Sequence, residues 1–178
     1  MAESLAAPES GSASLRLPEP ATTAALGLSL ARALLTVAPA RLVVHLEGEL
    51  GAGKTSLVRA LLAGLGHEGR VPSPTYTLVE PYALDRFRVL HVDLYRLRDP
   101  AELDDLGLLD ELDLADDEGR GRLLLAEWPD RGGHRLPGAD LCVQLAIEGN
   151  GRTARVLVAT PAGFPVLQAL LGNLEKGV

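Results

Sequence analysis

Apolar residues gather in short, nearly unbroken runs, and these runs are separated by stretches in which apolar residues recur at helical spacing. The runs are rich in Leu and Val, which suits strands that are buried on both faces of a parallel sheet. Strands of this kind are predicted at 42–46, 87–95 and 122–127. A shorter run at 14–17 predicts an edge strand.

Helices are predicted where Ala and Leu recur every three or four residues. We expect Thr22 or Thr23 to cap the first helix at its N-terminus. Gly66 follows the second helix and is expected to end it in the left-handed conformation. The three predicted helices span 22–36, 56–65 and 163–172.

A further helix start and a strongly acidic segment fall together at 99–118. Asp99 precedes Pro100, and Glu102 stands three residues after Asp99, which is a strong capping pattern; Gly107 is expected to end the short helix. The segment holds ten acidic residues and no basic one. This composition favours a solvated face, and a docking surface for a basic partner is the alternative.

The last strands are predicted as a hairpin. Residues 140–147 and 152–159 flank an Asn-Gly dipeptide, which is typical of a tight turn between antiparallel strands. Strand–loop–helix units followed by this hairpin predict an α/β protein, in a three-layer domain whose sheet is mostly parallel with an antiparallel hairpin extension. Residues 14–178 are expected to form this single domain, and residues 1–13 a disordered tail.

Composition narrows the class of protein. The 178 residues include 24 acidic and 17 basic side chains, and the net charge of −7 gives no general attraction for nucleic acid or an anionic membrane. Cys142 is the single cysteine, which excludes an intramolecular disulfide and a cysteine-based zinc cluster. The chain lacks a signal-peptide pattern and an uncharged apolar run of about 18 residues. We therefore expect a cytoplasmic protein that does not associate with a membrane.

The segment 48–55 carries the sharpest chemical signal. Its sequence, Gly-Glu-Leu-Gly-Ala-Gly-Lys-Thr, fits the phosphate-loop pattern G-x-x-x-x-G-K-[ST] at every fixed position, between a predicted strand and a predicted helix. Glycines let the main chain curl so that its N–H groups surround a phosphate. Lys54 can place a cation on the β- and γ-phosphates, and Thr55 can offer a hydroxyl to Mg²⁺. The predicted contacts with the nucleotide are Glu49, Leu50, Gly51, Ala52, Gly53, Lys54, Thr55 and Ser56.

ATP is favoured as the nucleotide over GTP. Phosphate-loop GTPases read guanine with an Asn-Lys-x-Asp segment, and neither Asn150 nor Asn173 stands in such a segment. A site that accepts several bases is the alternative.

Two carboxylates follow predicted strands and are candidates for handling magnesium. Asp93 ends the run 89–92, and Glu127 ends the run 123–126. The carboxyl ends of parallel strands lie at the same edge of a sheet as the phosphate loop. One carboxylate is expected to bind the metal and the other to position water, without an assignment of which does which; strand capping or pairing with an arginine is the alternative for each.

Three other residues have both a functional and a structural interpretation. Thr75 lies in a loop of the kind that senses a γ-phosphate or a metal, although Pro72 and Pro74 also make a rigid turn there. Trp128 is the single tryptophan and follows Glu127 directly, so it is either a nucleotide contact or a core anchor. His91 is flanked by apolar residues and is expected to be a core histidine.

Four segments together resemble one family. They are GELGAGKTSLVRALLAGLG (48–66), VPSPTYTLVEPY (71–82), HVDLYRLRDPAEL (91–103) and EWPDR (127–131), and the match runs from about Leu15 to the C-terminus. In this combination the chain resembles the TsaE family of small bacterial ATPases, which serve the synthesis of N6-threonylcarbamoyladenosine in tRNA.

The resemblance implies a phosphate-loop NTPase fold, binding of ATP with Mg²⁺, and hydrolysis that is slow in isolation. It implies TsaD and TsaB as protein partners, with tRNA met only through their complex. Lys54, Thr55, Thr75 and Asp93 match functional positions of the family. Glu127 and Trp128 also match functional positions of the family. Gly151-Arg152 matches a Gly-Arg pair in the late hairpin of the family. Arg152 is therefore expected to approach the nucleotide, and the alternative is an arginine that only forms part of the turn.

Two other functions remain open at this stage. A small-molecule or nucleotide kinase would need an acceptor pocket and an arginine-bearing lid, for which Arg120 and Arg122 could be mistaken. A non-catalytic module that holds ATP as a structural ligand would need fewer of the residues that are present here. The sequence therefore favours an ATPase over both.

Overall fold

The computed structural model describes residues 11–72, 74, 77–114, 116 and 118–175. Most of the predicted tail lies outside these residues. The first strand begins at Ser12 rather than at Ser14, because Ser12 and Ala13 already pair with Leu157 and Val156 of the last strand. Two residues that were assigned to the tail therefore belong to the sheet.

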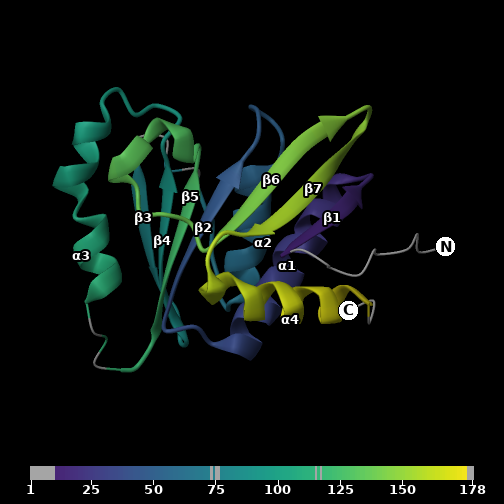
Figure 1. Cartoon of the computed structure of the whole chain (residues 1–178), viewed down its shortest axis with the longest axis horizontal. Coiled ribbons are helices and arrows are strands. Elements are labelled where there is room, and N and C mark those ends of the chain that lie inside the picture. The colour runs from purple at the N-terminus through teal and green to yellow at the C-terminus, as the bar shows by residue number, and fades with distance from the viewer. Residues whose placement is uncertain (1–10, 73, 75–76, 115, 117, 176–178) are drawn as a thin grey trace.

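The described part of the chain builds one sheet of seven strands in the order β1-β7-β6-β2-β5-β4-β3 (Figure 1). The four central strands β6, β2, β5 and β4 run parallel, while β7, β1 and β3 add antiparallel pairs at the two sides. The α/β class is confirmed, and the antiparallel pairs on both sides make the sheet mixed. The strands are β1 (Ser12–Leu17), β2 (Arg41–Glu47), β3 (Val79–Ala83), β4 (Phe87–Asp93), β5 (Gly121–Glu127), β6 (Leu141–Glu148) and β7 (Gly151–Val158).

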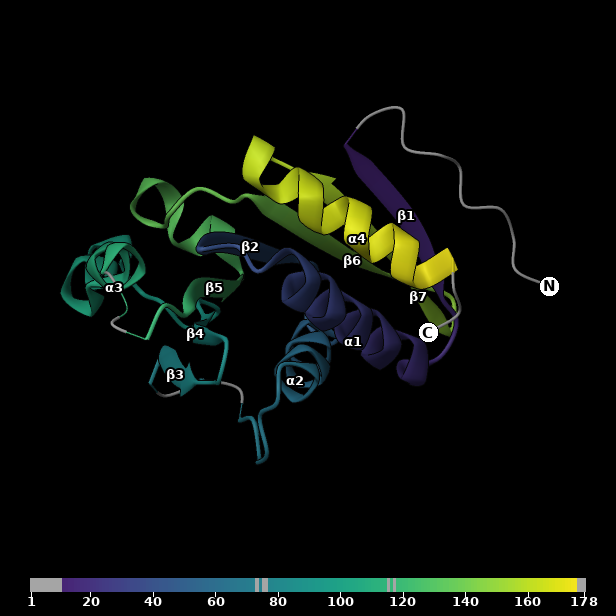
Figure 2. The same cartoon turned by 90° about the horizontal axis from the view of Figure 1, so that it is seen from below.

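Helices cover the sheet on both faces, which gives the predicted three layers. One apolar cluster joins the sheet to α1 (Pro20–Val37), α2 (Lys54–Gly64) and α4 (Phe164–Glu175). A second cluster, on the other face, joins β2, β4 and β5 to α3 (Leu108–Asp113). α3 stands apart from the group of three helices (Figure 2).

Helix α1 is long and apolar enough to cross a membrane by length and composition alone. It packs against α2 and α4, and Leu26, Leu30 and Leu34 are buried there. A Cβ atom at Gly27 would lie 2.5 Å from the main-chain oxygen of Leu57 in α2, so glycine is required at this close crossing. The apolar composition of α1 is thus explained by its place in the core.

One helix cap and one helix type differ from the prediction. Glu19, rather than Thr22 or Thr23, is the N-cap of α1; Pro20 occupies the first turn and the Thr22 hydroxyl donates back to the Glu19 carbonyl. The segment after Asp99 forms a 3₁₀ helix (Pro100–Leu106), with the predicted capping box in place. Since Gly107 then adopts the left-handed conformation, the chain turns into α3, which the acidic pattern did not predict.

Asp116 anchors the acidic segment to the start of β5. Its side chain is 3% exposed and forms ion pairs with Arg88, Arg120 and Arg122 at 2.8, 3.2 and 3.7 Å. Hydrogen bonds from Arg120, and further ones from main-chain N–H groups and Arg88, hold the pKa of Asp116 well below its ordinary value.

We predict that Asp116→Asn lowers the melting temperature at neutral pH, because the arginine cluster loses its shared anion. The pKa is lower in the folded chain than in the unfolded chain, so the stabilisation is complete above about pH 4 and declines as pH falls further. Thermal unfolding followed by circular dichroism across this range measures the effect. Asp113→Asn, which removes an exposed ion pair with Arg41, is the control; equal effects of the two substitutions would contradict the assignment.

Candidate functional site

The loop between β2 and α2 is shaped by glycines. Gly48 has a φ of 137°, and a Cβ atom at this position would lie 2.2 Å from the main-chain oxygen of Leu145. Gly53 has a φ of 109° and is the N-cap of α2, which begins at Lys54. Residues with a side chain rarely adopt these positive φ values, so glycine is required at both ends of the turn. The free N–H groups of the first turn of α2 therefore face the loop.

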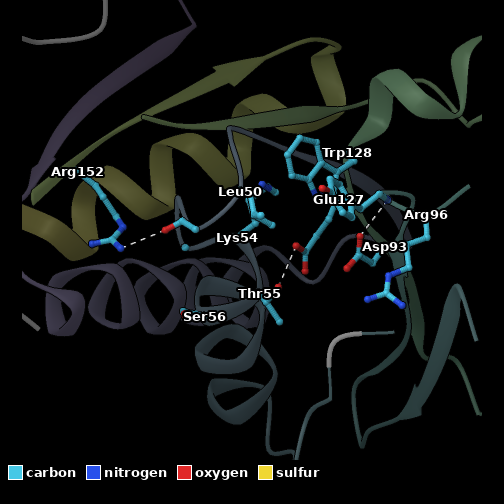
Figure 3. Close-up of a pocket in the computed structure, with 12 residues that line it drawn as sticks. Leu50, Lys54, Thr55, Ser56, Asp93, Arg96, Glu127, Trp128 and Arg152 are labelled. Carbon is cyan, nitrogen blue, oxygen red and sulfur yellow. Dashed lines mark hydrogen bonds between the residues drawn. The ribbon is translucent and has the colours of Figure 1, made fainter. Parts of the chain in front are cut away.

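A cavity of about 420 Å³ opens in front of this loop. Strands β4 and β5 bring their carboxyl ends to it, and Arg152 at the start of β7 reaches it from the other side (Figure 3). The residues that line the cavity come from these elements and from the loop itself: Leu50, Gly51, Gly53, Lys54, Thr55, Ser56, Asp93, Tyr95, Arg96, Glu127, Trp128 and Arg152.

Lys54 is 4% exposed and is held by the loop and by an aromatic ring. Its Nζ donates to the main-chain oxygens of Gly48 and Glu49 at 2.6 and 2.9 Å. The same Nζ lies 3.8 Å from the centre of the Trp128 ring, within the range of a cation–π contact. Burial lowers the pKa of Lys54 from its ordinary value, while Glu127 and Asp93 oppose this effect.

Glu127 is 2% exposed and joins the loop to the sheet. Its Oε2 accepts a hydrogen bond from Thr55 Oγ1 at 3.0 Å, the contact that Figure 3 marks between the first turn of α2 and the end of β5. Its Oε1 lies 2.8 Å from His91 Nε2. Both carboxylate oxygens therefore have partners.

Asp93 is the neighbour of Glu127 in the sheet. The two residues are register partners in the parallel pair β4–β5, so the predicted carboxylates meet at one edge. Asp93 Oδ1 accepts a hydrogen bond from the main-chain N–H of Tyr95 at 3.1 Å. Glu127 is the carboxylate that accepts the hydrogen bond from Thr55 Oγ1.

Trp128 occupies an unfavourable backbone conformation next to these groups. Its φ of 59° lies in the left-handed region, which a side chain of this size rarely adopts. The ring is half-buried and contacts Tyr95 at 5.0 Å between centroids as well as Lys54. Trp128 is therefore a wall of the cavity in addition to a packing residue.

Arg152 lies on the opposite side of the loop from Asp93 (Figure 3). Its Nη2 donates to the main-chain oxygen of Gly51 at 3.1 Å. Within the described residues, its Nε and the Thr23 hydroxyl are buried without a hydrogen-bond partner, and both side chains border Gly53. Buried polar atoms of this kind are usually satisfied by a partner, so this side of the loop suits a polar ligand.

Most predicted site residues meet at the cavity, with three exceptions. Ala52 is fully buried in the core, and Glu49 contributes its main-chain oxygen to Lys54 without lining the cavity. Thr75 lies outside the described residues. Arg120 and Arg122 bind Asp116 near the start of β5, whereas the cavity lies at the end of that strand, so they form no lid over it.

The sequence interpretation missed two residues of this region. Tyr95 and Arg96 line the cavity, and the signal was their position directly after the strand that ends at Asp93. The expectation that His91 is a core histidine is confirmed: it is fully buried, and its partner is Glu127.

The donors that face the cavity are hard oxygen atoms. Two carboxylates and one hydroxyl suit Mg²⁺, which keeps several waters or phosphate oxygens among its ligands. Among the described residues, no cluster of three or more His, Cys, Asp or Glu side chains could hold a metal ion. Thr55, Asp93 and Glu127 are the residues at this cavity that could contact a metal ion.

Comparisons with known proteins identify a family and several relatives that this chain resembles. The family model described as threonylcarbamoyl adenosine biosynthesis protein TsaE matches residues 17–156. The TsaE protein of Haemophilus influenzae is 40% identical over 128 residues, which cover 72% of this chain and 77% of that protein. The Bacillus subtilis TsaE protein is 38% identical over 121 residues, which cover 68% and 70%.

A solved structure shares the fold. The crystal structure of Bacillus subtilis YdiB aligns with a TM-score of 0.67 at 24% identity, over 90% of this chain and 95% of that one. The fold is that of the phosphate-loop NTPases, as the resemblance implied. The chain belongs to the TsaE family, whose role lies in the biosynthesis of threonylcarbamoyladenosine in tRNA.

Proposed function

We propose that this chain is a Mg²⁺-dependent ATPase that binds TsaB and TsaD and supports formation of N6-threonylcarbamoyladenosine at position 37 of tRNAs reading ANN codons. The observation that carries the ATPase proposal is the hydrogen bond from Thr55 Oγ1 to Glu127 Oε2 at 3.0 Å. It joins a loop suited to phosphates to a strand-end carboxylate. Binding a nucleotide requires the loop alone, whereas hydrolysis also requires control of magnesium and water.

Five side chains at the cavity have a role in this proposal. Lys54 binds the β- and γ-phosphates, and Thr55 and Glu127 hold Mg²⁺ and its water shell. Bound Mg²⁺ would neutralise charge on the phosphate oxygens. Asp93, fixed by the main chain of Tyr95, orients water beside Glu127. Arg152 approaches the nucleotide from the other side of the loop.

The partner proposal rests on family membership. TsaD would transfer the threonylcarbamoyl group, and this chain would support turnover of the TsaB–TsaD complex without contacting tRNA directly. A kinase is less well supported, because the arginines considered for a lid bind Asp116 instead.

We predict that ATP changes the fluorescence of Trp128, the single tryptophan. The phosphates compete for Lys54 Nζ, which lies 3.8 Å from the ring, so binding alters the charge beside the indole. Titration with Mg²⁺ and a non-hydrolysable ATP analogue measures the effect. Lys54→Met should weaken binding by about 10-fold to 100-fold, as expected for loss of a charge-assisted contact. Wild-type affinity in Lys54→Met would exclude the proposed phosphate contact.

We also predict that Glu127→Gln binds ATP and loses hydrolysis. The amide is similar in size to the carboxylate but lacks its charge, and turnover should fall by at least about 100-fold. Phosphate release is measured with and without purified TsaB and TsaD, and the pair should stimulate the wild-type chain strongly.

Glu111→Gln, on α3 and outside the cavity, is the matched control. An active Glu127→Gln variant would remove the proposed role of this carboxylate. Transfer of label from γ-labelled ATP to an acceptor other than water would favour the kinase.

A further inference from the structure

His91 is the buried group closest to the proposed chemistry that has no role in it so far. Its ring is fully buried, and its Nε2 lies 2.8 Å from Oε1 of Glu127, which is itself 2% exposed. The other oxygen of the same carboxylate accepts from Thr55 Oγ1 at 3.0 Å. Glu127 thus lies between a histidine on β4 and the first turn of α2.

Strand register brings the histidine to this place. Asp93 pairs with Glu127 and His91 pairs with Leu125 across β4 and β5. Side chains two residues apart lie on the same face of a sheet, so His91 projects on the face that carries Glu127. Val89 and Leu125 on this face belong to the cluster that packs against α2. The histidine therefore lies one pair behind the carboxylate on the α2 side.

The second ring nitrogen indicates which nitrogen carries the proton. Within the described part of the chain, His91 Nδ1 is buried and has no hydrogen-bond partner. A proton on Nδ1 would bury a donor without an acceptor, which costs more than leaving the lone pair of a neutral ring unpaired. The proton therefore belongs on Nε2, where it is donated to Glu127.

A fixed donor at Oε1 determines where Oε2 points. The terminal torsion of a glutamate is broad, so the carboxylate plane rotates easily unless both oxygens are held. Partners of this kind behind a metal-handling residue orient it, and their loss typically costs about 10-fold to 100-fold in metal affinity or activity. A histidine that merely fills the core would not have this effect.

We propose that His91 is a positioning residue for magnesium: its Nε2–H holds the Glu127 carboxylate in the orientation that meets Thr55 and the metal. This inference rests on the proposed ATPase function. His91 itself touches neither nucleotide nor metal and acts through Glu127.

The test compares His91→Met with His91→Gln in the full chain. The two side chains are similar in size and flexibility, but only glutamine carries an N–H group that can donate to Glu127. A fluorescent non-hydrolysable ATP analogue is titrated in EDTA and again in saturating Mg²⁺, and phosphate release from ATP is measured in parallel.

His91→Met should leave the affinity in EDTA unchanged, while the gain in affinity from Mg²⁺ and the turnover number fall by about 10-fold to 100-fold. His91→Gln should recover most of both. His45→Met is the control, since His45 lies on β2 and its Nε2 contacts the Pro137 carbonyl instead; it should retain the wild-type magnesium gain.

Several outcomes would overturn the inference. A wild-type magnesium gain in His91→Met, or equal losses in His91→Met and His91→Gln, would reduce His91 to a packing residue. Those outcomes would leave the proposed ATPase intact. In contrast, a wild-type chain that binds ATP without any gain from Mg²⁺ would overturn both this inference and the proposed ATPase.

A measurement on the wild-type chain keeps the inference testable if His91→Met does not fold. Side-chain ¹H–¹⁵N spectra of the histidines, assigned with His91→Gln, should show a proton on Nε2 of His91. A ring without a proton on Nε2 would overturn the proposed donation to Glu127.

Discussion

The hydrogen bond between Thr55 and Glu127 is the contact on which the site depends. It joins the first turn of α2 to the end of β5, and its acceptor, Glu127, is 2% exposed. A hydrogen bond to a buried charged group is stronger than one at the surface, and leaving the carboxylate without its donors would be costly. The loop before α2 is thus held in register with the sheet edge that carries both carboxylates.

The sheet makes this contact possible through its parallel centre. β2 lies beside β5, and β5 lies beside β4, so the loop that follows β2 and the carboxylates that end β4 and β5 emerge at one edge. Gly48 and Gly53 turn the chain there, because neither residue has a Cβ atom that would contact its neighbours. Trp128, in a left-handed conformation directly after β5, then closes one side of the cavity over Lys54. Backbone strain of this kind is often found at functional sites.

Much of this arrangement could be predicted from local sequence. The spacing of Gly48, Gly53, Lys54 and Thr55 identifies the loop, because the curl of the backbone depends on residues close together in the chain. Apolar runs ending in an acid predicted which strands deliver Asp93 and Glu127.

Other features depend on contacts between distant segments, which a local pattern does not contain. The partner of His91 is 36 positions away and follows from strand register, and Arg152 meets Gly51 across 101 positions. Glu19 is the N-cap of α1 because Pro20 is favoured at the first position of a helix and Thr22 completes the capping box. Gly107 ends the helix after Asp99 as predicted, but α3 was missed, because the same left-handed glycine also turns the chain into another helix.

The central claim is that the loop holds a triphosphate while Thr55 and Glu127 manage its magnesium. A crystal structure of the chain with Mg²⁺ and a non-hydrolysable ATP analogue tests it most directly. The account predicts phosphates along residues 48–55 and a magnesium ion beside Thr55 Oγ1, with Glu127 facing the metal or its water. A nucleotide bound outside this cavity, or a metal whose ligands and waters are out of reach of Glu127, would contradict it.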